Sequence, residues 1–456
     1  MLHFSDTVAA VSTPRGKGGI AVIRISGPET GALLQKVFRG KRDPVANPRR
    51  ACFGEILDHD GTVLDEGLAL YFSAPHSFTG EDVAELSCHG GALLTETVLA
   101  AVLTAGARAA EAGEFTRRAL MNGKITLCSA EALGALLEAN TTGQMTLARG
   151  GMSGRLSAAV GKTFDRLSLL LADAYAKIDF PDEDLNSMSR EAFTDALDGV
   201  KAQIDRLLAT YRTGHAVAEG ISTVICGPVN AGKSTLYNAL VGRDAAIVTD
   251  VAGTTRDILC ETVALGSVTL RLSDTAGLRE TADAVEGIGV ERARRAMEQA
   301  ELILAVLDAS APATKEQTEL LDELQKLTAA VVVVLNKCDN GVSFDTNLLK
   351  DFAHVVRLSA KEGDLTPLRE TVEGLYLSDG LSLREDAVVA NARQYAALKR
   401  AADGLSTAVA SLRAEVPLDA ACIDAELAMQ ALGEVDGRAV DEAIVASIFS
   451  HFCVGK

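Results

Sequence analysis

The sequence predicts a multidomain protein of combined α/β and α class. We expect an N-terminal α+β domain and a helical domain into which an α/β domain is inserted. The chain has 456 residues, which is too long for one ordinary hydrophobic core and suggests two to three domains. Strand-like and helix-like segments alternate from about residue 221 to 377, as in domains with a parallel sheet. Helical stripes of apolar residues occur on both sides of that stretch, and this predicts an insertion.

The N-terminal part, residues 1–120, combines short strand-like runs with one apolar helical stretch. The strand-like runs include "GGIAVIRISG", "EGLALYF" and "EDVAELSCHGG", and the helical stretch is "ALLTETVLAAVLTAG". Glycines separate these runs, which is typical of an α+β domain.

The helical domain is predicted in two halves, residues 121–217 and 379–456, with the α/β domain at 218–378 between them. In both halves apolar residues recur in steps of four and three, which places them on one face of a helix. The segment "DFPDED" at 179–184 ends the first long helix. The apolar positions of these stripes are Val160, Phe164, Leu167, Leu171, Ala174 and Ile178; Phe193, Leu197, Val200, Ile204, Leu207 and Tyr211; and Leu398, Ala402, Leu405, Val409 and Leu412.

The charge balance disfavours general binding to nucleic acid. The chain has 44 Lys and Arg against 62 Asp and Glu, a net charge of −18, so its average field repels phosphate backbones. A contact with nucleic acid would therefore need a local basic patch. The segment "FRGKRDPVANPRR" at 38–50 is a candidate, although a solvated loop explains it equally well.

The cysteine pattern and the apolar runs bear on compartment. None of the eight cysteines forms a CxxC pair, and their spacing matches no zinc site. Scattered thiols in a chain of this length suggest the reducing cytosol, so we expect a cytoplasmic protein. The N-terminus lacks the pattern of a signal peptide, and the longest apolar run, residues 329–335, is too short to cross a bilayer. No membrane association is expected.

A phosphate-binding loop is predicted at "GPVNAGKST", residues 227–235, between an apolar strand and a helix-like segment. Gly227 and Gly232 let backbone amides wrap the phosphates, and Lys233 reaches the β and γ oxygens. Ser234 supplies a hydroxyl ligand to Mg²⁺. The remaining residues of this loop that we expect to contact the nucleotide are Asn230, Ala231 and Thr235.

A second motif, "DTAG" at 274–277, follows the next apolar strand. Asp274 is expected to bind the Mg²⁺ shell through water, and the Gly277 amide to contact the γ-phosphate. Thr275 and Ala276 complete this nucleotide contact. The upstream segment "TDVAGTTRD" at 249–257 is the predicted switch loop, in which Thr255 is a second hydroxyl ligand of Mg²⁺.

Two further loops predict that the base is guanine. In "NKCD" at 336–339, Asp339 can accept from N1–H and N2–H₂ of guanine, a donor pair that adenine lacks. Asn336 supports the O6 and N7 edge, and Lys337 packs over the base. The segment "SAK", formed by Ser359, Ala360 and Lys361, supplies a backbone amide to O6. Four such elements in this order, each at the end of a strand, predict a GTP-binding protein.

One residue raises a question about hydrolysis. In Ras-like hydrolases a Gln follows the "DTAG" motif and orients the attacking water, but here that residue is Leu278. Three carboxylates follow closely, Asp283, Glu286 and Glu291. Any one of them could hold the water, and their spacing alone favours ordinary solvated charges.

With these motifs the chain resembles the tRNA-modifying GTPase family called MnmE or TrmE, over its whole length. It shares the family's stretches "DTVAAVSTPRGKGGIAVIRISG", "SFTGEDVAELSCHGG", "GEFTRRALMNGK", "AKIDFPDED" and the C-terminal "FCVGK". The resemblance implies an N-terminal folate-binding domain, a helical domain, and a Ras-like P-loop GTPase domain inserted in the helical one.

The same resemblance implies the activity and the partners. Members form a homodimer through the N-terminal domain and join an FAD-dependent partner, MnmG or GidA, in a heterotetramer or larger assembly. Together they modify carbon 5 of the wobble uridine of certain tRNAs with an aminomethyl or carboxymethylaminomethyl group. The one-carbon unit comes from a tetrahydrofolate derivative, 5-formyl- or methylene-tetrahydrofolate.

The family also implies an answer for Leu278. A K⁺ ion takes roughly the place of an arginine finger when two GTPase domains meet, and Glu286 orients the water. An arginine finger is worth about 10³–10⁵ in rate, and a held cation could supply a similar share. Arg256, in the predicted switch loop, is a second candidate catalytic residue. The implied K⁺ ligands are Asn230, Thr249, Val251 and Thr254, of which Thr249 and Thr254 also belong to the predicted nucleotide site.

In the N-terminal domain the implied folate contacts are Arg24, Glu85, Lys124 and Lys456. From the sequence alone, Arg24 reads equally as an ordinary charge on the face of a strand. Cys453 of "FCVGK" is a possible functional thiol, and a buried structural thiol is about equally expected. The chain departs from the family in the P-loop, where Val229 stands in place of the usual Pro before Asn230.

A second functional class stays open at this point. The GTPase could act as a regulatory switch that controls partner docking, with the folate-like domain as a scaffold. Bound tetrahydrofolate, and loss of the modified uridine on deletion, would separate the enzyme from the switch.

Overall fold

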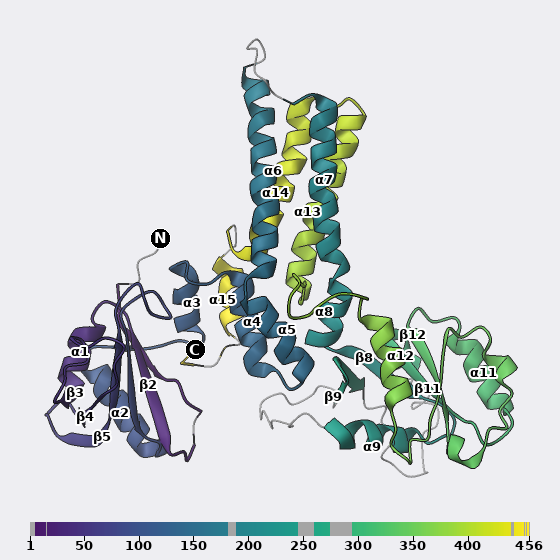
Figure 1. Cartoon of the computed structure of the whole chain (residues 1–456), viewed down its shortest axis with the longest axis horizontal. Helices are drawn as coiled ribbons and strands as arrows, with labels where there is room; N and C mark the ends of the chain where they lie inside the picture. The colour runs from purple at the N-terminus through teal and green to yellow at the C-terminus, as the bar shows by residue number, and fades with distance from the viewer. Residues whose placement is uncertain are drawn as a thin grey trace. The chain divides into compact units, whose positions relative to one another are not determined.

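The computed structural model describes residues 5–14, 16–180, 188–244, 260–273, 294–438, 442–450, 452 and 454–455. The chain divides into two compact units. The first, the N-terminal unit, consists of residues 1–134 and 433–456, and the second consists of residues 135–432 (Figure 1). The C-terminal 24 residues thus pack with the beginning of the chain. The domain boundaries given above stay predictions.

A seven-stranded sheet forms the N-terminal unit, in the order β3-β4-β5-β6-β2-β1-β7. All neighbouring strands run antiparallel except β1 and β7, which are parallel. The strands are β1 (Val8–Val11), β2 (Ile20–Ser26), β3 (Phe38–Gly40), β4 (Cys52–Leu57), β5 (Val63–Phe72), β6 (Val83–His89) and β7 (Arg108–Ala109).

Two helices, α1 (Thr30–Val37) and α2 (Ala92–Thr104), cover one face of this sheet. The strands alternate, so that Ile23, Ile25 and Leu86 join the helices in the core and are 0% exposed. Residues of opposite parity face away from these helices, among them Phe53, which is 64% exposed. Three further helices belong wholly or partly to this unit: α3 (Glu114–Met121), α4 (Leu127–Glu138) and α15 (Glu442–Ser450).

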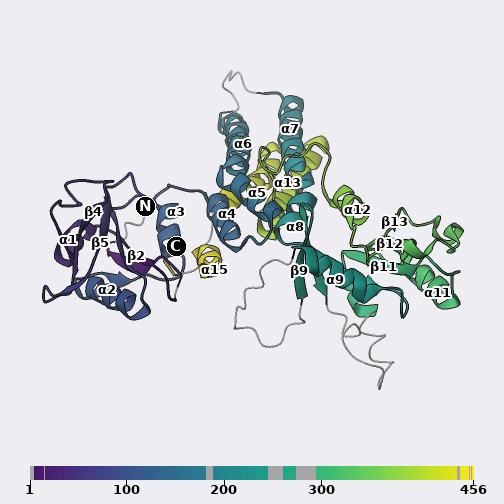
Figure 2. The ribbon, with the colours of Figure 1, turned by 60° about the horizontal axis from the view of Figure 1, so that its bottom comes forward.

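Long helices make up one part of the second unit. Helix α7 packs along α6 and α13, and Figures 1 and 2 show these helices side by side. The predicted apolar stripes supply much of the buried surface, for example Leu167, Leu197 and Leu405, each 0% exposed. The helices are α5 (Thr142–Met152), α6 (Arg155–Asp179), α7 (Arg190–Ala209), α8 (Tyr211–Ala218), α13 (Ala392–Arg413) and α14 (Leu418–Asp436).

A six-stranded sheet forms the other part, in the order β13-β12-β11-β8-β10-β9. Its strands run parallel except for the antiparallel pair β9–β10. The strands are β8 (Ile221–Cys226), β9 (Cys260–Leu265), β10 (Val268–Ser273), β11 (Leu302–Asp308), β12 (Ala330–Asn336) and β13 (His354–Arg357).

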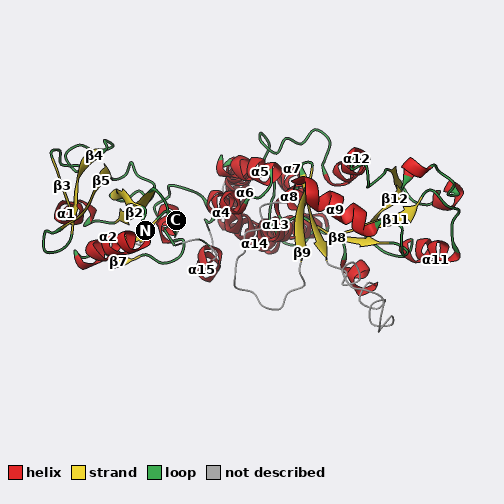
Figure 3. Ribbon diagram, turned by 90° about the horizontal axis from the view of Figure 1, so that it is seen from below, coloured by secondary structure: helices red, strands yellow, loops and turns green. Residues whose placement is uncertain are grey.

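Both faces of this sheet are covered, which explains the continuous apolar runs of its central strands. Helices α9 (Lys233–Asp244) and α12 (Thr366–Tyr376) pack on one face, and α11 (Lys315–Leu324) packs on the other (Figure 3). In β12, Val332 and Val334 face the first layer, while Val333 and Leu335 face the second. The predicted combination of α+β, helical and parallel α/β parts is confirmed.

Within the described ranges, none of the helices combines the length and the apolar character that crossing a membrane requires.

Candidate functional site

The predicted phosphate-binding loop connects β8 to α9 at the carboxyl end of the parallel strands. Two of its glycines occupy positions that no other residue fits. Gly227 has φ 141°, and a Cβ there would lie 2.1 Å from the Val306 carbonyl oxygen. Gly232 has φ 99°, and its Cβ would lie 2.1 Å from Asn336 Nδ2. The loop therefore closes tightly onto the sheet just before α9 begins, and helix starts of this kind favour phosphate.

Lys233 is held over this loop by backbone carbonyls. Its Nζ donates to the carbonyl oxygens of Gly227 and Pro228, both at 2.8 Å. Burial lowers the pKa of Lys233, because the ammonium is half buried without a carboxylate in contact. A phosphate would supply the missing negative charge. Beside it, burial raises the pKa of the Cys226 thiol to about 12, so that cysteine is neutral and not a nucleophile.

The other predicted residues of the loop differ in exposure. Ala231 is buried, whereas Asn230, Ser234 and Thr235 are exposed and accessible to ligands. Asn230 adopts φ 64°, a conformation that Asn tolerates better than most residues. Val229, at the position where the family usually has Pro, is 80% exposed and so does not disturb the packing of the loop.

Asn336, at the end of β12, ties two loops together. Its side chain is nearly buried, and its Nδ2 donates to the Ala231 carbonyl at 3.0 Å. Its Oδ1 accepts from the Ala360 N–H at 2.9 Å. One amide thus joins the phosphate-binding loop to the predicted base-binding loop, a role that the sequence reading missed. Its predicted support of the guanine edge stays a prediction.

The remaining base-binding residues lie in loops beside Asn336. Lys337 has φ 63°, and its Nζ lies 2.7 Å from Asp308 Oδ2 at the end of β11. Burial would raise the pKa of Asp308, but its bonds to Lys337 and Ser310 lower it on balance. Asp308 was not foreseen, although an acid at the end of the strand "LILAVLD" was a visible signal. Exposed residues of these loops are Asp339 and Lys361, and buried ones are Ser359 and Ala360.

Several predicted residues lie outside the described part of the chain, so the structure does not place them. They are the switch-loop and catalytic residues Thr249, Val251, Thr254, Thr255, Arg256 and Glu286; Asp274, Thr275, Ala276 and Gly277 of "DTAG"; and Cys453 and Lys456 at the C-terminus.

In the N-terminal unit, two predicted folate contacts form a cross-strand pair. Arg24 on β2 lies opposite Glu85 on β6, and its Nη2 and Nε lie 2.8 and 3.1 Å from Glu85 Oε1. The Arg24 Cζ also lies 5.7 Å from the ring centres of both Phe78 and Phe115. The sequence reading missed these two rings, which hold the guanidinium by cation–π attraction.

Lys124 contacts the loop that carries Phe78. Its Nζ donates to the Pro75 carbonyl at 2.8 Å, and its stem lies against Gly80. Lys124 and Arg24 therefore contact the same loop, residues 73–82, which we call the pocket loop.

The C-terminal tail reaches the N-terminal sheet. Val454 forms an antiparallel bridge with Ala112, and Ser12 Oγ donates to the Gly455 carbonyl at 3.0 Å. Both contacts lie within the N-terminal unit, between residues more than 340 positions apart.

A charged junction lies between helix α8 and the six-stranded sheet. His215 Nε2 lies 3.2 Å from Glu301 Oε1, and Glu301 Oε2 accepts from the Ser222 N–H at 2.9 Å. The bond to Glu301 raises the pKa of His215, with a smaller contribution from Glu219, whereas Arg271 on β10 opposes it. The same bond lowers the pKa of Glu301.

Comparison with known proteins assigns the whole chain. The model of the "GTP-binding protein TrmE N-terminus" matches residues 7–124. The model of the "MnmE helical domain" matches residues 127–453, which is more than half of the chain. The chain belongs to the MnmE family of tRNA modification GTPases. Its MnmE relatives match it from end to end, so the family covers both compact units.

Two of these relatives carry the name "tRNA modification GTPase MnmE". The one from Symbiobacterium thermophilum is 41% identical over 457 residues, which covers 99% of this chain and 99% of its own length. The one from Bacillus subtilis (strain 168) is 39% identical over 460 residues, covering 99% of this chain and all of its own. Among solved structures, the G domain of the T. maritima FeoB iron transporter is 24% identical over 35% of this chain and 99% of its own, with a TM-score of 0.27. That score is too low to support an argument.

Proposed function

We propose that this MnmE-family chain is a GTP hydrolase that depends on Mg²⁺ and K⁺ and acts in modification of the wobble uridine of tRNA. The observation that carries the GTP part is the Asn336 amide, which joins the phosphate-binding loop to the loop of Ser359–Lys361. A single ligand that bears phosphates at one end and a base at the other would meet both loops. The presence of Asp339 at the base end favours guanine.

The described residues fit the nucleotide and its metal ions. The cradle at Gly227 and Gly232 would be filled by any Cβ, so it is shaped for close approach of phosphate to backbone. The exposed Ser234, in the first turn of α9, would bind Mg²⁺, which bridges and neutralises the phosphate oxygens when bound. Lys233 would exchange its two backbone carbonyls for phosphate oxygens and thereby recover the charge partner that burial denies it.

K⁺ is the proposed substitute for the missing water-orienting Gln and the arginine finger. Asn230 is exposed, and within the described ranges its side-chain amide forms no hydrogen bond, so it is free to ligate a cation. The other proposed ligands, Thr249, Val251 and Thr254, would close over the ion when two copies meet. Glu286 would then orient the attacking water.

The experiment is GTP turnover across the alkali metals, with dimerisation followed in parallel by light scattering. We expect K⁺ to accelerate hydrolysis by orders of magnitude over Na⁺ and to promote dimerisation with a transition-state mimic. Equal rates in both salts would remove the cation from the proposal.

For the N-terminal unit we propose a site for 5-formyl- or methylene-tetrahydrofolate. Arg24 spends Nε and Nη2 on a single oxygen of Glu85. The other Glu85 oxygen and Arg24 Nη1 form no side-chain hydrogen bond within the described ranges, so they remain available to a ligand. An acid beside an arginine suits the amide edge of a pterin, and a lysine such as Lys124 suits the glutamate tail. When bound, the folate would supply the one-carbon unit.

The larger assembly follows the family. We propose a homodimer that joins the FAD-dependent MnmG and acts on tRNA in the cytoplasm. The six cysteines that the described ranges resolve as free thiols fit that compartment. Deletion should remove the modified uridine from tRNA, and purified protein should bind 5-formyltetrahydrofolate. If neither is observed, the regulatory-switch interpretation replaces the enzyme.

A further inference from the structure

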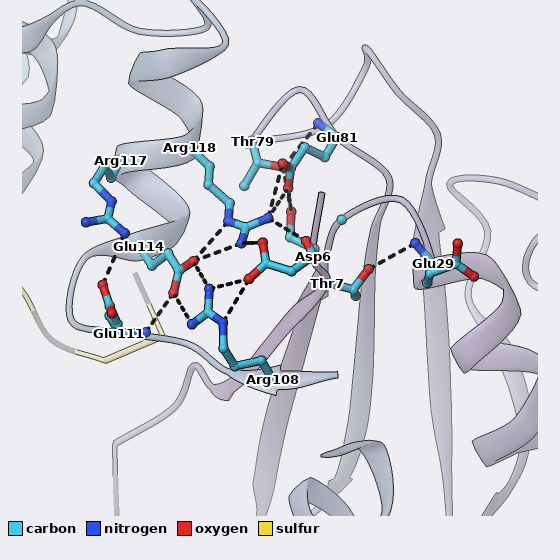
Figure 4. Close-up of polar contacts among 12 residues, drawn as sticks. Asp6, Thr7, Glu29, Thr79, Glu81, Arg108, Glu111, Glu114, Arg117 and Arg118 are labelled. Atoms are coloured by element: carbon cyan, nitrogen blue, oxygen red, sulfur yellow. Dashed lines mark hydrogen bonds and ion pairs between the residues drawn. The ribbon is translucent and has the colours of Figure 1, made fainter. Parts of the chain in front are cut away.

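A fully buried arginine lies at the centre of a polar network in the N-terminal unit (Figure 4). Arg118, on α3, is 0% exposed. Its Nη2 donates to Glu114 Oε1 at 2.8 Å and to Asp6 Oδ1 at 2.9 Å. Its Nη1 donates to the Asp6 carbonyl at 3.0 Å and to both Glu81 oxygens at 3.2 Å. One guanidinium therefore contacts three carboxylates from three separate segments.

A second arginine completes the network. Arg108 on β7 donates to both oxygens of Glu114, at 2.7 and 3.1 Å, and to Asp6 at 2.8 Å. Burial would raise the pKa of Glu114, but its bonds to Arg108, Arg118 and the Glu111 N–H lower it on balance. Three carboxylates thus share two guanidiniums, and all five groups stay charged at neutral pH.

A buried network of this kind is weak evidence for stability alone. Removing charges from water costs several kcal/mol per ion, and well-packed apolar residues often do as well or better. What such a network does supply is fixed geometry, because each partner must keep its place to avoid a buried unpaired charge. The question is which segment is being held.

The segment that Glu81 belongs to is the pocket loop. Ser26 Oγ, at the end of β2, donates to Glu81 Oε2 at 2.7 Å and lies 2.8 Å from Thr79 Oγ1. Asn122, just after α3, donates through Nδ2 to the Thr79 carbonyl at 2.8 Å. Thr79 and Ser26 are both 0% exposed. The loop is therefore fastened at Thr79 and Glu81 to one strand and to α3.

Phe78 immediately precedes this fastened pair. Its ring, 39% exposed, lies 5.7 Å from the Arg24 guanidinium, and Phe115 of α3 lies at the same distance. A shift of the loop at Glu81 would carry Phe78 away from Arg24. It would also move the Pro75 carbonyl, which accepts from Lys124.

We propose that Arg118 and Glu81 are positioning residues of the N-terminal site: their contact sets the pocket loop so that Phe78 lies against Arg24 and the loop meets Lys124. This rests on the folate site of the proposed function. Neither residue contacts the ligand in this scheme. They act through Phe78, Arg24 and Lys124, and the effect on binding comes from the position of the loop.

The test uses the full-length chain and two measurements. Glu81→Gln keeps the size of the side chain and an acceptor for Ser26 but removes the charge that faces Arg118. Glu55→Gln is the matched control, since Glu55 pairs with Arg39 in the same sheet through exposed side chains. The first measurement is the Kd for 5-formyltetrahydrofolate. The second is the acrylamide quenching of Phe78→Trp, a unique reporter because the chain contains no tryptophan.

We expect Glu81→Gln to weaken folate binding by on the order of tenfold, which corresponds to ~1.4 kcal/mol. In the Phe78→Trp background it should increase quenching of the indole. Glu55→Gln should change neither value, and GTP turnover should be the same in all variants. A loss of fold alone would not give this pattern, because turnover and the thermal transition would then change as well.

Two outcomes separate this inference from the proposed function. If the unaltered chain binds folate and Glu81→Gln matches the control in both measurements, the positioning role is wrong while the folate site stands. If the unaltered chain does not bind folate, the folate site fails, and the quenching result still decides whether Glu81 positions the loop. Should Glu81→Gln not fold, Asn122→Ala removes only the bond to the Thr79 carbonyl, and the same two measurements apply to it.

Discussion

The phosphate-binding loop of the second unit and the Arg24–Glu85 site of the N-terminal unit recognise their proposed ligands in different ways. The first is built from backbone at strand ends, and its essential residues, Gly227 to Ser234, are contiguous in the sequence. The second is built from side chains on two neighbouring strands, 61 residues apart, with Phe78 and Phe115 from two further segments.

The difference follows from what each ligand offers. A phosphate group presents identical oxygens that any run of N–H groups can meet, so a short loop and the start of a helix suffice. A ring with a defined pattern of donors and acceptors requires side chains at fixed positions, and only a folded sheet places them. The first site is therefore visible as a motif, whereas the second depends on long-range contacts. Four predictions break or sharpen this comparison, in order of decreasing effect.

The largest effect is expected at Glu286, which carries hydrolysis and not the binding of GTP. Glu286→Ala should lower GTP turnover by about 10²–10⁴-fold, the share that a positioned acid–base group contributes, while the Kd for GTP stays unchanged. Glu291→Ala, a carboxylate five residues later, is the control and should keep near-normal turnover. Equal activity of both variants would return the Leu278 problem to an open state.

Base recognition should be the next largest effect. Asp339→Asn inverts one partner of the guanine edge, so preference should shift from GTP toward xanthosine triphosphate. A bidentate base contact is worth about 1–3 kcal/mol, which is roughly 10- to 150-fold in relative affinity. Competition binding of the two nucleotides measures it. Unchanged preference for GTP would show that Asp339 does not read the base.

A smaller effect is expected when the cross-strand pair is broken. Arg24→Gln should weaken binding of 5-formyltetrahydrofolate by about tenfold, or ~1.4 kcal/mol, since Glu85 loses its partner. GTP turnover in the same preparation should be unaffected, because the GTP site is built from other segments. Arg39→Gln removes an exposed arginine from the same sheet and serves as the control. Weaker binding in both variants would point to loss of the sheet, not of the site.

The smallest effect concerns pH, to which the two units should respond in opposite directions. His215 has a raised pKa, so its bond to Glu301 stabilises fully below pH 6.5 and is lost as the pH rises through the raised value. Asp6 has a lowered pKa: burial would raise it, but its bonds to Arg108 and Arg118 prevail. Its contribution is present above pH 3.8 and is lost as the pH falls through the lowered value.

Each of these partly exposed pairs is expected to contribute about 1 kcal/mol. The protection of residues 211–226 against hydrogen exchange, corrected for the intrinsic effect of pH, should differ between His215→Gln and the unaltered chain at pH 6 and converge at alkaline pH. For Asp6→Asn the difference in residues 108–121 should converge at acid pH instead. The same pH dependence in both segments would contradict the two assignments.

Much of the GTPase part could be predicted from sequence. The loop from Gly227 to Ser234, the strand "AVVVVL" with Asn336 after it, and Asp339 were all recognisable, because each lies within a few residues of its strand end. The link from Asn336 to Ala231 and Ala360 was not, since it joins loops that are 105 and 24 residues away. Asp308 was missed for the same reason, as its partner Lys337 follows a different strand.

By itself, the sequence determined the class of fold, the phosphate-binding loop and the family, because periodicity, glycine positions and motifs are local properties of the chain. Only the tertiary structure decided that Arg24 pairs with Glu85 between two aromatic rings, that Arg118 is buried among three carboxylates, and that residues 433–456 pack with the N-terminal sheet. These contacts join segments up to 443 residues apart, and their energy exists only once the backbone has brought them together.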